Sequence, residues 1–152
     1  MSTWTEQLTA NAAPAAVLDV LTDPRAAARW APVDFEVRQL DGDRLRAGSR
    51  AHVAGRLAGR EVGFDVEIVA ADEERLALLA SGPVHLDVEY LLRPLPAGSE
   101  VRASVAVRGR GLTGRVLAQA TGALLSAGAL RQAVARIARE AEYVAVPYAA
   151  AA

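Results

Sequence analysis

The fold is decided by residues 84–120, VHLDVEYLLRPLPAGSEVRASVAVRGRGLTGRVLAQA. Apolar and polar residues alternate over 84–93 and again over 100–109, as they do in half-buried strands. The turn between these runs is too short for a crossover, so the two strands must be antiparallel neighbours. From about residue 113 the apolar residues recur every three to four positions, which predicts a helix. A sheet strand therefore leads directly into a helix.

That junction contains a G-x-G-x-x-G motif at residues 109–114, between a strand and a helix, which is the setting of a dinucleotide-binding fingerprint. A dinucleotide fold also needs a later parallel strand that ends in an acidic residue. After Gly114 the next acidic residue is Glu140, inside the predicted helix, and no strand follows. We interpret the glycines as a sharp turn and expect no NAD, FAD or ATP binding. Arg110 and Arg115 leave open an anion at the helix N-terminus.

Working outward, the same periodicities divide the whole chain. Strands are predicted at 3–10, 34–40, 49–57, 60–69, 75–81, 84–93 and 100–109, short helices at 11–21 (capped by Asn11) and 23–30, and a long helix at 113–143. Short turns require antiparallel strands, and the last helix is the only element long enough to cover them. We predict an α+β fold with a seven-stranded antiparallel sheet. Residues 1–146 form its single domain, and residues 147–152 a frayed tail.

Composition narrows the function classes. The 152 residues are 52% hydrophobic and 23% charged, with a net charge of −1, which gives no reason to expect nucleic acid or an anionic membrane as a partner. No run is long and apolar enough for membrane insertion. The first residues, MSTWTEQLTA, lack the basic and apolar regions of a secretory signal, so we expect a cytoplasmic protein.

Two residue types are missing altogether. The sequence has no cysteine, which excludes thiol nucleophiles, disulfides and thiolate metal sites. All 17 basic residues are arginine, which excludes Schiff-base lysines. The motifs G-x-S-x-G, H-E-x-x-H and the Walker phosphate loop are also absent. Two histidines, His52 and His85, remain as candidates.

Strand alternation sorts the side chains into two faces. The apolar face carries Val53, Leu57, Val62, Phe64, Val66, Ile68, Val84, Leu86, Val88, Tyr90, Leu92, Val101, Val105 and Val107. The other face is charged. A turn about residues 58–59 sets Arg56 opposite Glu61, His52 opposite Asp65, and Arg50 opposite Glu67, pairs that stabilise antiparallel strands. The same alternation directs Asp87 and Glu89 toward Arg108 and its neighbours.

The histidines could form a general-base pair (His52 with Asp65) or a metal site (His85 with Asp87 or Glu89). Both groups fall on the face away from the long helix, where we expect no pocket. We therefore predict surface roles for them, with no metal site and no cofactor. Alanine at both histidines should leave function intact.

The chain resembles the SRPBCC superfamily, which includes START-like lipid-transfer domains and polyketide cyclase/aromatases. The resemblance rests on ANAAPAAVLDVLTDPRAAARWAP at 10–32, AGSEV at 97–101 and the long final helix, and it covers about residues 3–145. It implies a helix-grip fold, in which a curved sheet wraps around the C-terminal helix and encloses a cavity. It places Trp30 near the cavity mouth. Leu18 stands where relatives often have a bulky aromatic residue.

Together, the apolar face and this resemblance predict a ligand-binding cavity. We expect it to be lined by Trp30, Val53, Phe64, Val66, Val88, Tyr90, Val105, Val107, Leu117, Thr121, Leu124 and Gly128. Small residues such as Ala120, Thr121 and Gly128 leave space beneath the sheet, and we expect Gly128 inside the helix. The alternative is that these residues pack into a filled core.

Two function classes follow from such a cavity. The first is binding of a hydrophobic, lipid-like or aromatic small molecule, the default for an apolar pocket with few polar groups. The second is a polyketide cyclase/aromatase-type enzyme, whose cyclisation and dehydration need proton donors and acceptors in the cavity. Tyr90, Thr121, Ser126 and Trp30 could supply them, and Arg29 or Gln39 could reach the entrance; this scarcity of polar groups favours binding. Tyr90 is the best catalytic candidate if the protein is an enzyme. A third class, a chaperone-regulating or ribosome-associated member, would need an exposed interaction surface.

Overall fold

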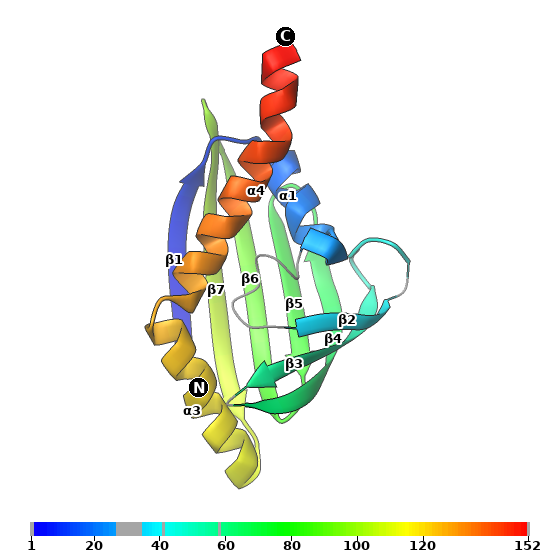
Figure 1. Ribbon diagram of the computed structural model, residues 1–152, viewed down its shortest axis with the longest axis vertical. Coiled ribbons are helices and arrows are strands. Elements are labelled where there is room, and N and C mark those ends of the chain that lie inside the picture. The colour runs from blue at the N-terminus through cyan, green and yellow to red at the C-terminus, as the bar shows by residue number, and fades with distance from the viewer. Residues whose placement is uncertain (1, 27–34, 41, 58, 152) are drawn as a thin grey trace.

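A computed structural model describes residues 2–26, 35–40, 42–57 and 59–151. Its strands are β1 (Ser2–Ala10), β2 (Phe35–Leu40), β3 (Arg50–Leu57), β4 (Arg60–Ala71), β5 (Arg75–Ser81), β6 (Val84–Leu95) and β7 (Gly98–Gly109). Its helices are α1 (Pro14–Thr22), α3 (Gly111–Ser126) and α4 (Ala129–Ala151). The predicted strands are confirmed to within two residues at each end. The α+β helix-grip class is confirmed as well (Figure 1).

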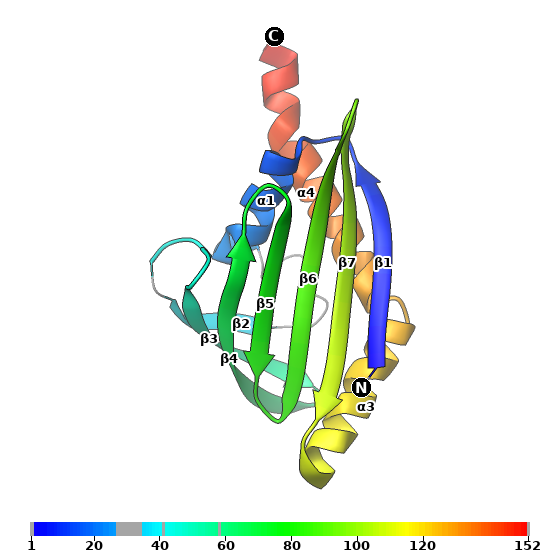
Figure 2. The same ribbon diagram turned by 180° about the vertical axis from the view of Figure 1, so that it is seen from behind.

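The strands form one curved antiparallel sheet in the order β1-β7-β6-β5-β4-β3-β2 (Figure 2). From β2 to β7 each strand pairs with the next in the chain. β1 joins at the far edge, where it pairs with β7 from Ser2 opposite Val107 to Ala10 opposite Ser99. The register predicted for β3 and β4 is confirmed, with Arg50 opposite Glu67 and His52 opposite Asp65.

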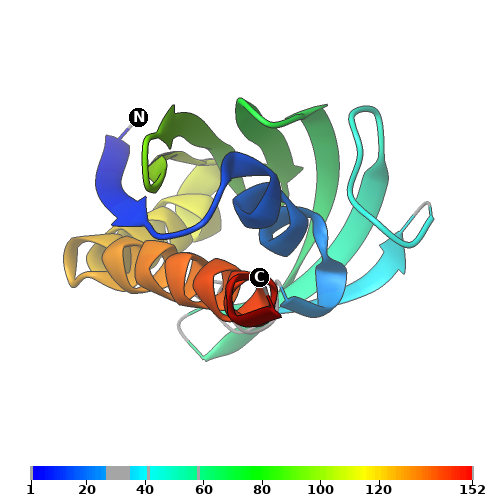
Figure 3. The same cartoon turned by 90° about the horizontal axis from the view of Figure 1, so that it is seen from above.

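The helices cover the concave face of the sheet unevenly. Helix α4 packs on β1 and β7 and against α1, and α1 packs on β5, β6 and β7. Helix α3 lies at the other end, on β7, β6, β1 and β3. Seen from above, the strands curl round to face the helices (Figure 3). The core lies between these layers and includes Val17, Leu21, Ile137 and Val134, all buried.

The long C-terminal helix is broken, which corrects the prediction of one continuous helix over 113–143. Helix α3 ends where the amides of Ala127 and Gly128 donate to the carbonyls of Ala123 (2.9 Å) and Leu125 (3.2 Å). Gly128 has φ +101°, a left-handed conformation that suits glycine after a helix. Helix α4 then runs through Pro147 to Ala151, past the residue where we expected the tail to begin.

The break also shifts the buried side of α3. Its buried residues include Leu117, Thr121 and Leu125, whereas Leu124, which we placed on the buried stripe, is 39% exposed. Gly128 is not inside a helix, and a side chain added there would meet no atom within 4 Å. Substitution at Gly128 is therefore strained by its backbone conformation rather than by crowding.

The G-x-G-x-x-G segment is the strand-to-helix turn that we predicted. A Cβ on Gly109 would collide with the carbonyl of Gly114, and a Cβ on Gly114 would lie 2.5 Å from the carbonyl oxygen of Pro83. Gly111 has φ +63°. All paired strands of the described residues are antiparallel, so they contain no Rossmann-type unit. The absence of nucleotide binding stays a prediction.

The connection from β1 to α1 differs in detail from the prediction. Asn11 does not cap α1, because the N-cap is Ala13 and Pro14 occupies the first turn. The connection is held instead by the buried Ser99, whose hydroxyl donates to the carbonyl of Ala12 (2.5 Å). A further helical turn begins at Pro24. The rest of the predicted helix at 23–30, including Trp30, lies outside the described residues.

Candidate ligand-binding site

One end of the concave face, beneath α1 and α4, is closed. Leu76, Tyr90 and Ala103 lie side by side across β5, β6 and β7, because Leu76 pairs with Tyr90 and Tyr90 with Ala103. All three are buried, as is the neighbouring Leu92. This end is conventional hydrophobic core.

The other end, toward α3, is different. Five of its inward-facing apolar side chains are only partly buried: Val53, Val66, Leu78, Leu86 and Val88. They form a continuous patch, because Val88 pairs with Leu78 on β5 and the next row joins Leu86, Ala80 and Val66. Solvent-accessible apolar surface on the concave side of a sheet is what a hydrophobic ligand site requires.

Most of the predicted site residues meet around this patch. Phe64 is buried beside Val53, its partner on β3, and Val105 lies next to Val88 on β7. Val107 is buried one row further along. Leu117 and Thr121 contribute from the buried side of α3. Leu124 and Gly128 are placed elsewhere, as described above.

Leu78 and Leu86 belong to the patch although the predicted site omitted them. Strand alternation already assigns Leu86 to the apolar face, because it lies between the inward-facing Val84 and Val88. This pattern could have identified it as a site residue. Leu78 lies in the segment RLALLAS, where both odd-numbered and even-numbered positions are apolar. Alternation therefore does not show which residues of this strand face inward. Pairing with Ile68 and Val88 settles the orientation of Leu78.

Few polar groups accompany the patch. The hydroxyl of Thr121 donates to the carbonyl of Leu117 in its own helix (2.8 Å). The hydroxyl of Ser126, which we considered for the cavity, instead accepts a hydrogen bond from the indole of Trp4 (3.0 Å). Burial raises the pKa of the Tyr90 phenol far above its usual range, because the phenolate is disfavoured away from water. Tyr90 therefore stays protonated at neutral pH.

The convex face carries the predicted charges, with some different partners. His52 Nδ1 lies 3.1 Å from Asp65 Oδ1, as expected. Glu61 pairs with Arg38 of β2 (2.8 Å), although Arg56 is opposite it in the ladder. Glu89 pairs with Arg75 (3.0 Å) rather than with the Arg108 side of the sheet.

The other predicted histidine group does not form a metal site in the described part of the chain. His85, and not Asp87 or Glu89, lies opposite Arg108. The Nε2 atom of His85 is buried without a hydrogen-bond partner among the described residues. No group of three histidine or acidic side chains able to hold a metal occurs in the described ranges.

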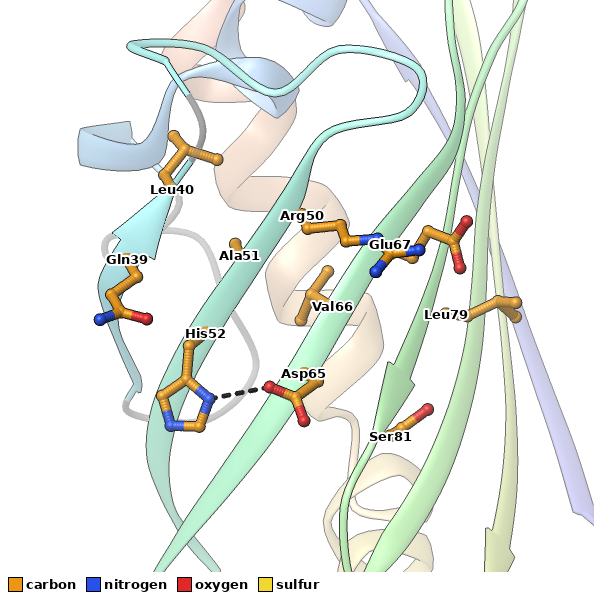
Figure 4. Close-up of a pocket in the computed structure, with 10 residues that line it drawn as sticks. All are labelled: Gln39, Leu40, Arg50, Ala51, His52, Asp65, Val66, Glu67, Leu79 and Ser81. Atoms are coloured by element: carbon orange, nitrogen blue, oxygen red, sulfur yellow. Dashed lines mark hydrogen bonds and ion pairs between the residues drawn. The ribbon is translucent and has the colours of Figure 1, made fainter.

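The expectation that no pocket forms on the convex face is wrong. An open groove of about 630 Å³ crosses β2 to β5, and its lining includes Gln39, Arg50, His52, Asp65, Glu67, Leu79 and Ser81. Figure 4 shows His52 and Ser81 on opposite sides of Asp65. A Ser–His–Asp nucleophile needs the histidine in the middle, so this row cannot activate Ser81. Residues of four neighbouring strands line the groove, so alternation along single strands does not reveal it.

Comparison with known proteins gives the family. Residues 1–142 match the family described as polyketide cyclase / dehydrase and lipid transport. The chain belongs to this family, and the predicted SRPBCC resemblance is confirmed. None of the curated protein sequences matches it.

Solved structures share the fold at low sequence identity. Protein CV1439 from Chromobacterium violaceum is 18% identical with a TM-score of 0.68, covering 93% of this chain and 99% of its own. TTHA0849 from Thermus thermophilus is 14% identical with a TM-score of 0.70, covering 94% and 99%. DynU16, from the dynemicin biosynthetic locus, is 22% identical with a TM-score of 0.59, covering 91% of this chain and 46% of its own.

Family and fold together support a role in hydrophobic ligand binding or polyketide cyclase-type chemistry. Within the described residues, no helix is both long and apolar enough to cross a bilayer.

Proposed function

We propose that the protein binds a hydrophobic small molecule, lipid-like or aromatic, between the open end of the concave sheet face and helix α3. The patch Val53, Val66, Leu78, Leu86 and Val88 forms the floor of this cavity, with Phe64, Tyr90, Val105 and Val107 at its borders. Leu117 and Thr121 face it from α3. The predicted contribution of Trp30 stays part of the proposal.

One observation carries this proposal: inward-facing apolar side chains stay accessible at one end of the face and are fully buried at the other. A filled core would bury both ends alike, since protein interiors are close-packed. Keeping five aliphatic side chains partly accessible is unfavourable for stability, because each buried methylene contributes about 0.8 kcal/mol. A bound apolar ligand would recover that free energy.

The scarcity of polar groups favours binding over catalysis. Thr121 already donates to its own helix, and the neutral phenol of Tyr90 can donate a proton but cannot act as a base at neutral pH. Cyclisation of a polyketide chain needs a base to form the attacking carbanion as well as a donor for the carbonyl oxygen. Among the described inward-facing residues, Tyr90 supplies a proton donor, and we identify no base.

The second candidate, a polyketide cyclase/aromatase-type enzyme, is favoured by Tyr90 itself. Tyr90 belongs to the closed row, and Val88 is the next inward-facing residue of β6, so in this proposal the phenol lies at the inner end of the cavity. A protonated phenol there could stabilise a developing oxyanion by donating a hydrogen bond. The origin of DynU16 in a biosynthetic locus gives this alternative its chemical setting.

The test is to fill the proposed cavity with a larger side chain on β5. Leu78 faces inward and its neighbour Leu79 outward, so Leu78→Trp should abolish binding of an apolar fluorescent probe while the matched control Leu79→Trp preserves it. Circular dichroism would establish that both variants are folded. Native mass spectrometry of the parent protein should show a co-purified apolar compound that Leu78→Trp lacks. Equal probe binding by the two variants would overturn the proposed cavity.

The variant Tyr90→Phe distinguishes a catalytic role from ligand binding alone. If Tyr90 only orients a ligand, this change should weaken binding by about 0.5–1.5 kcal/mol, the net value of one hydrogen bond. If it acts in cyclisation, turnover of an aromatic polyketide precursor should fall more than affinity does.

A further inference from the structure

Helix α3 exposes an apolar side to solvent. Six apolar residues lie on it at helical spacing, with the exposed Thr113 among them, and we call this side the α3 outer face: Leu112, Val116, Ala120, Ala123, Leu124 and Ala127. Leu112 is 82% exposed and Val116 62% exposed. The opposite side of α3 already packs on the sheet through Leu117, Thr121 and Leu125. The outer face is therefore apolar without serving the core of the described structure.

The shape of the molecule presents this face. Helix α3 extends past the end of the sheet that is opposite the C-terminus, in both views of the ribbon (Figures 1 and 2). At about 1.5 Å per residue its 16 residues span about 24 Å. Because α3 extends beyond the strands, its outer face can contact a broad, flat surface without obstruction by the sheet.

The charged residues of α3 and its N-cap are all basic. Between Glu100 and Glu140 the sequence contains seven arginines and no acidic residue. A net charge of −1 for the whole chain therefore conceals a basic final third. Arg110 at the N-cap of α3 and Arg115 in its first turns are both exposed. Neither forms an ion pair with another described residue.

A second copy of the chain does not suit this face. A stable protein interface takes about 20–30 residues per side, whereas the α3 outer face has six. A two-fold contact would match the patch to itself, and the patch holds no acidic residue to pair with Arg110 or Arg115. Its exposed side chains are aliphatic apart from Thr113, without the tyrosine and tryptophan that dominate protein contacts.

We infer that the α3 outer face docks the protein on the surface of an anionic phospholipid bilayer. The helix lies in the plane of the interface, with Leu112 and Val116 among the upper acyl chains and Arg110 and Arg115 at the lipid phosphates. Amphipathic helices with aliphatic residues on one side and arginine at its border bind membranes in this way. The protein does not span the bilayer. This inference uses a surface outside the proposed cavity and does not depend on the cavity's ligand.

The experiment is sedimentation with vesicles of phosphatidylcholine alone or mixed one-to-one with phosphatidylglycerol. The parent protein should bind the mixed vesicles, and high salt should weaken that binding. The double variant Leu112→Gln with Val116→Gln should weaken it by at least about tenfold, since burial of these side chains is lost. Arg115→Gln should weaken it by about fivefold.

The matched controls substitute exposed residues of the same types at positions away from α3. Val69→Gln on β4 and Arg60→Gln at the start of β4 should bind vesicles as the parent does. Leu78→Trp should also bind them, which separates docking from uptake of lipid into the cavity. Sedimentation of none of the proteins, or equal binding by the α3 double variant, would overturn the inference. So would light scattering that shows the parent to be a dimer and the double variant a monomer.

Discussion

The two ends of the concave sheet face are built from the same kinds of residue and differ in what lies over them. Leu76 and Leu78 are both inward-facing leucines of β5, two residues apart. Leu76 is fully buried beneath the end of the sheet that α1 and α4 cover, whereas Leu78 is partly exposed. Alternation in the sequence therefore determines which face is apolar, and the helices determine which part of that face becomes core.

The sharpest test of this contrast replaces each leucine with alanine. Leu76→Ala should lower the free energy of unfolding by about 2–5 kcal/mol, because it leaves a cavity in close-packed core. Leu78→Ala should cost clearly less, since part of that side chain already contacts solvent. Urea unfolding monitored by circular dichroism measures both. Equal losses would show that the two ends are packed alike.

A second test concerns how α3 is held over the open end. Gly122 lies against Trp4 of β1, and a Cβ at this position would be 3.0 Å from the indole ring. Gly122→Ala should therefore destabilise the protein by about 1–3 kcal/mol through overpacking, despite the better helix propensity of alanine. Thermal unfolding gives the sign. Ala123→Ser, on the exposed side of the same helix, is the control and should change stability little.

Tyr90 lies at the boundary between the ends, and its titration reports on burial there. Its pKa is raised in the folded state, so the folded protein retains a proton that the unfolded chain loses above about pH 10. The contribution to stability is complete below that pH and falls by about 1.4 kcal/mol per pH unit above it. Unfolding measured at several alkaline pH values should show this fall in the parent and a smaller one in Tyr90→Phe. The same fall in both proteins would mean that the phenol is accessible to water.

The smallest effect is expected outside the concave face. His52→Ala removes an exposed contact with Asp65 and should change stability by less than about 1 kcal/mol. Probe binding in the cavity should be unchanged. Loss of probe binding in His52→Ala would mean that the convex groove, rather than the concave patch, holds the ligand.

Strand positions and their register could be predicted because the alternation is strong and the turns are short. The pairing of His52 with Asp65 followed directly from the turn at residues 58–59. The break at Gly128 was missed because small residues surround it and the apolar spacing continues across it. The inward residues of β5 were missed because that strand is apolar on both sides. The convex groove is lined by residues of four strands, so no pattern within a single strand predicts it.

The pairing of β1 with β7 has a consequence for the order of assembly. Ser2 lies opposite Val107, so the first strand of this sheet to be synthesised pairs with the last strand of this sheet. The strands from β2 to β7 can form hairpin by hairpin as they emerge, since neighbours in the chain are neighbours in the sheet. β1 must wait unpaired while about a hundred residues are synthesised, at about 5–20 residues per second.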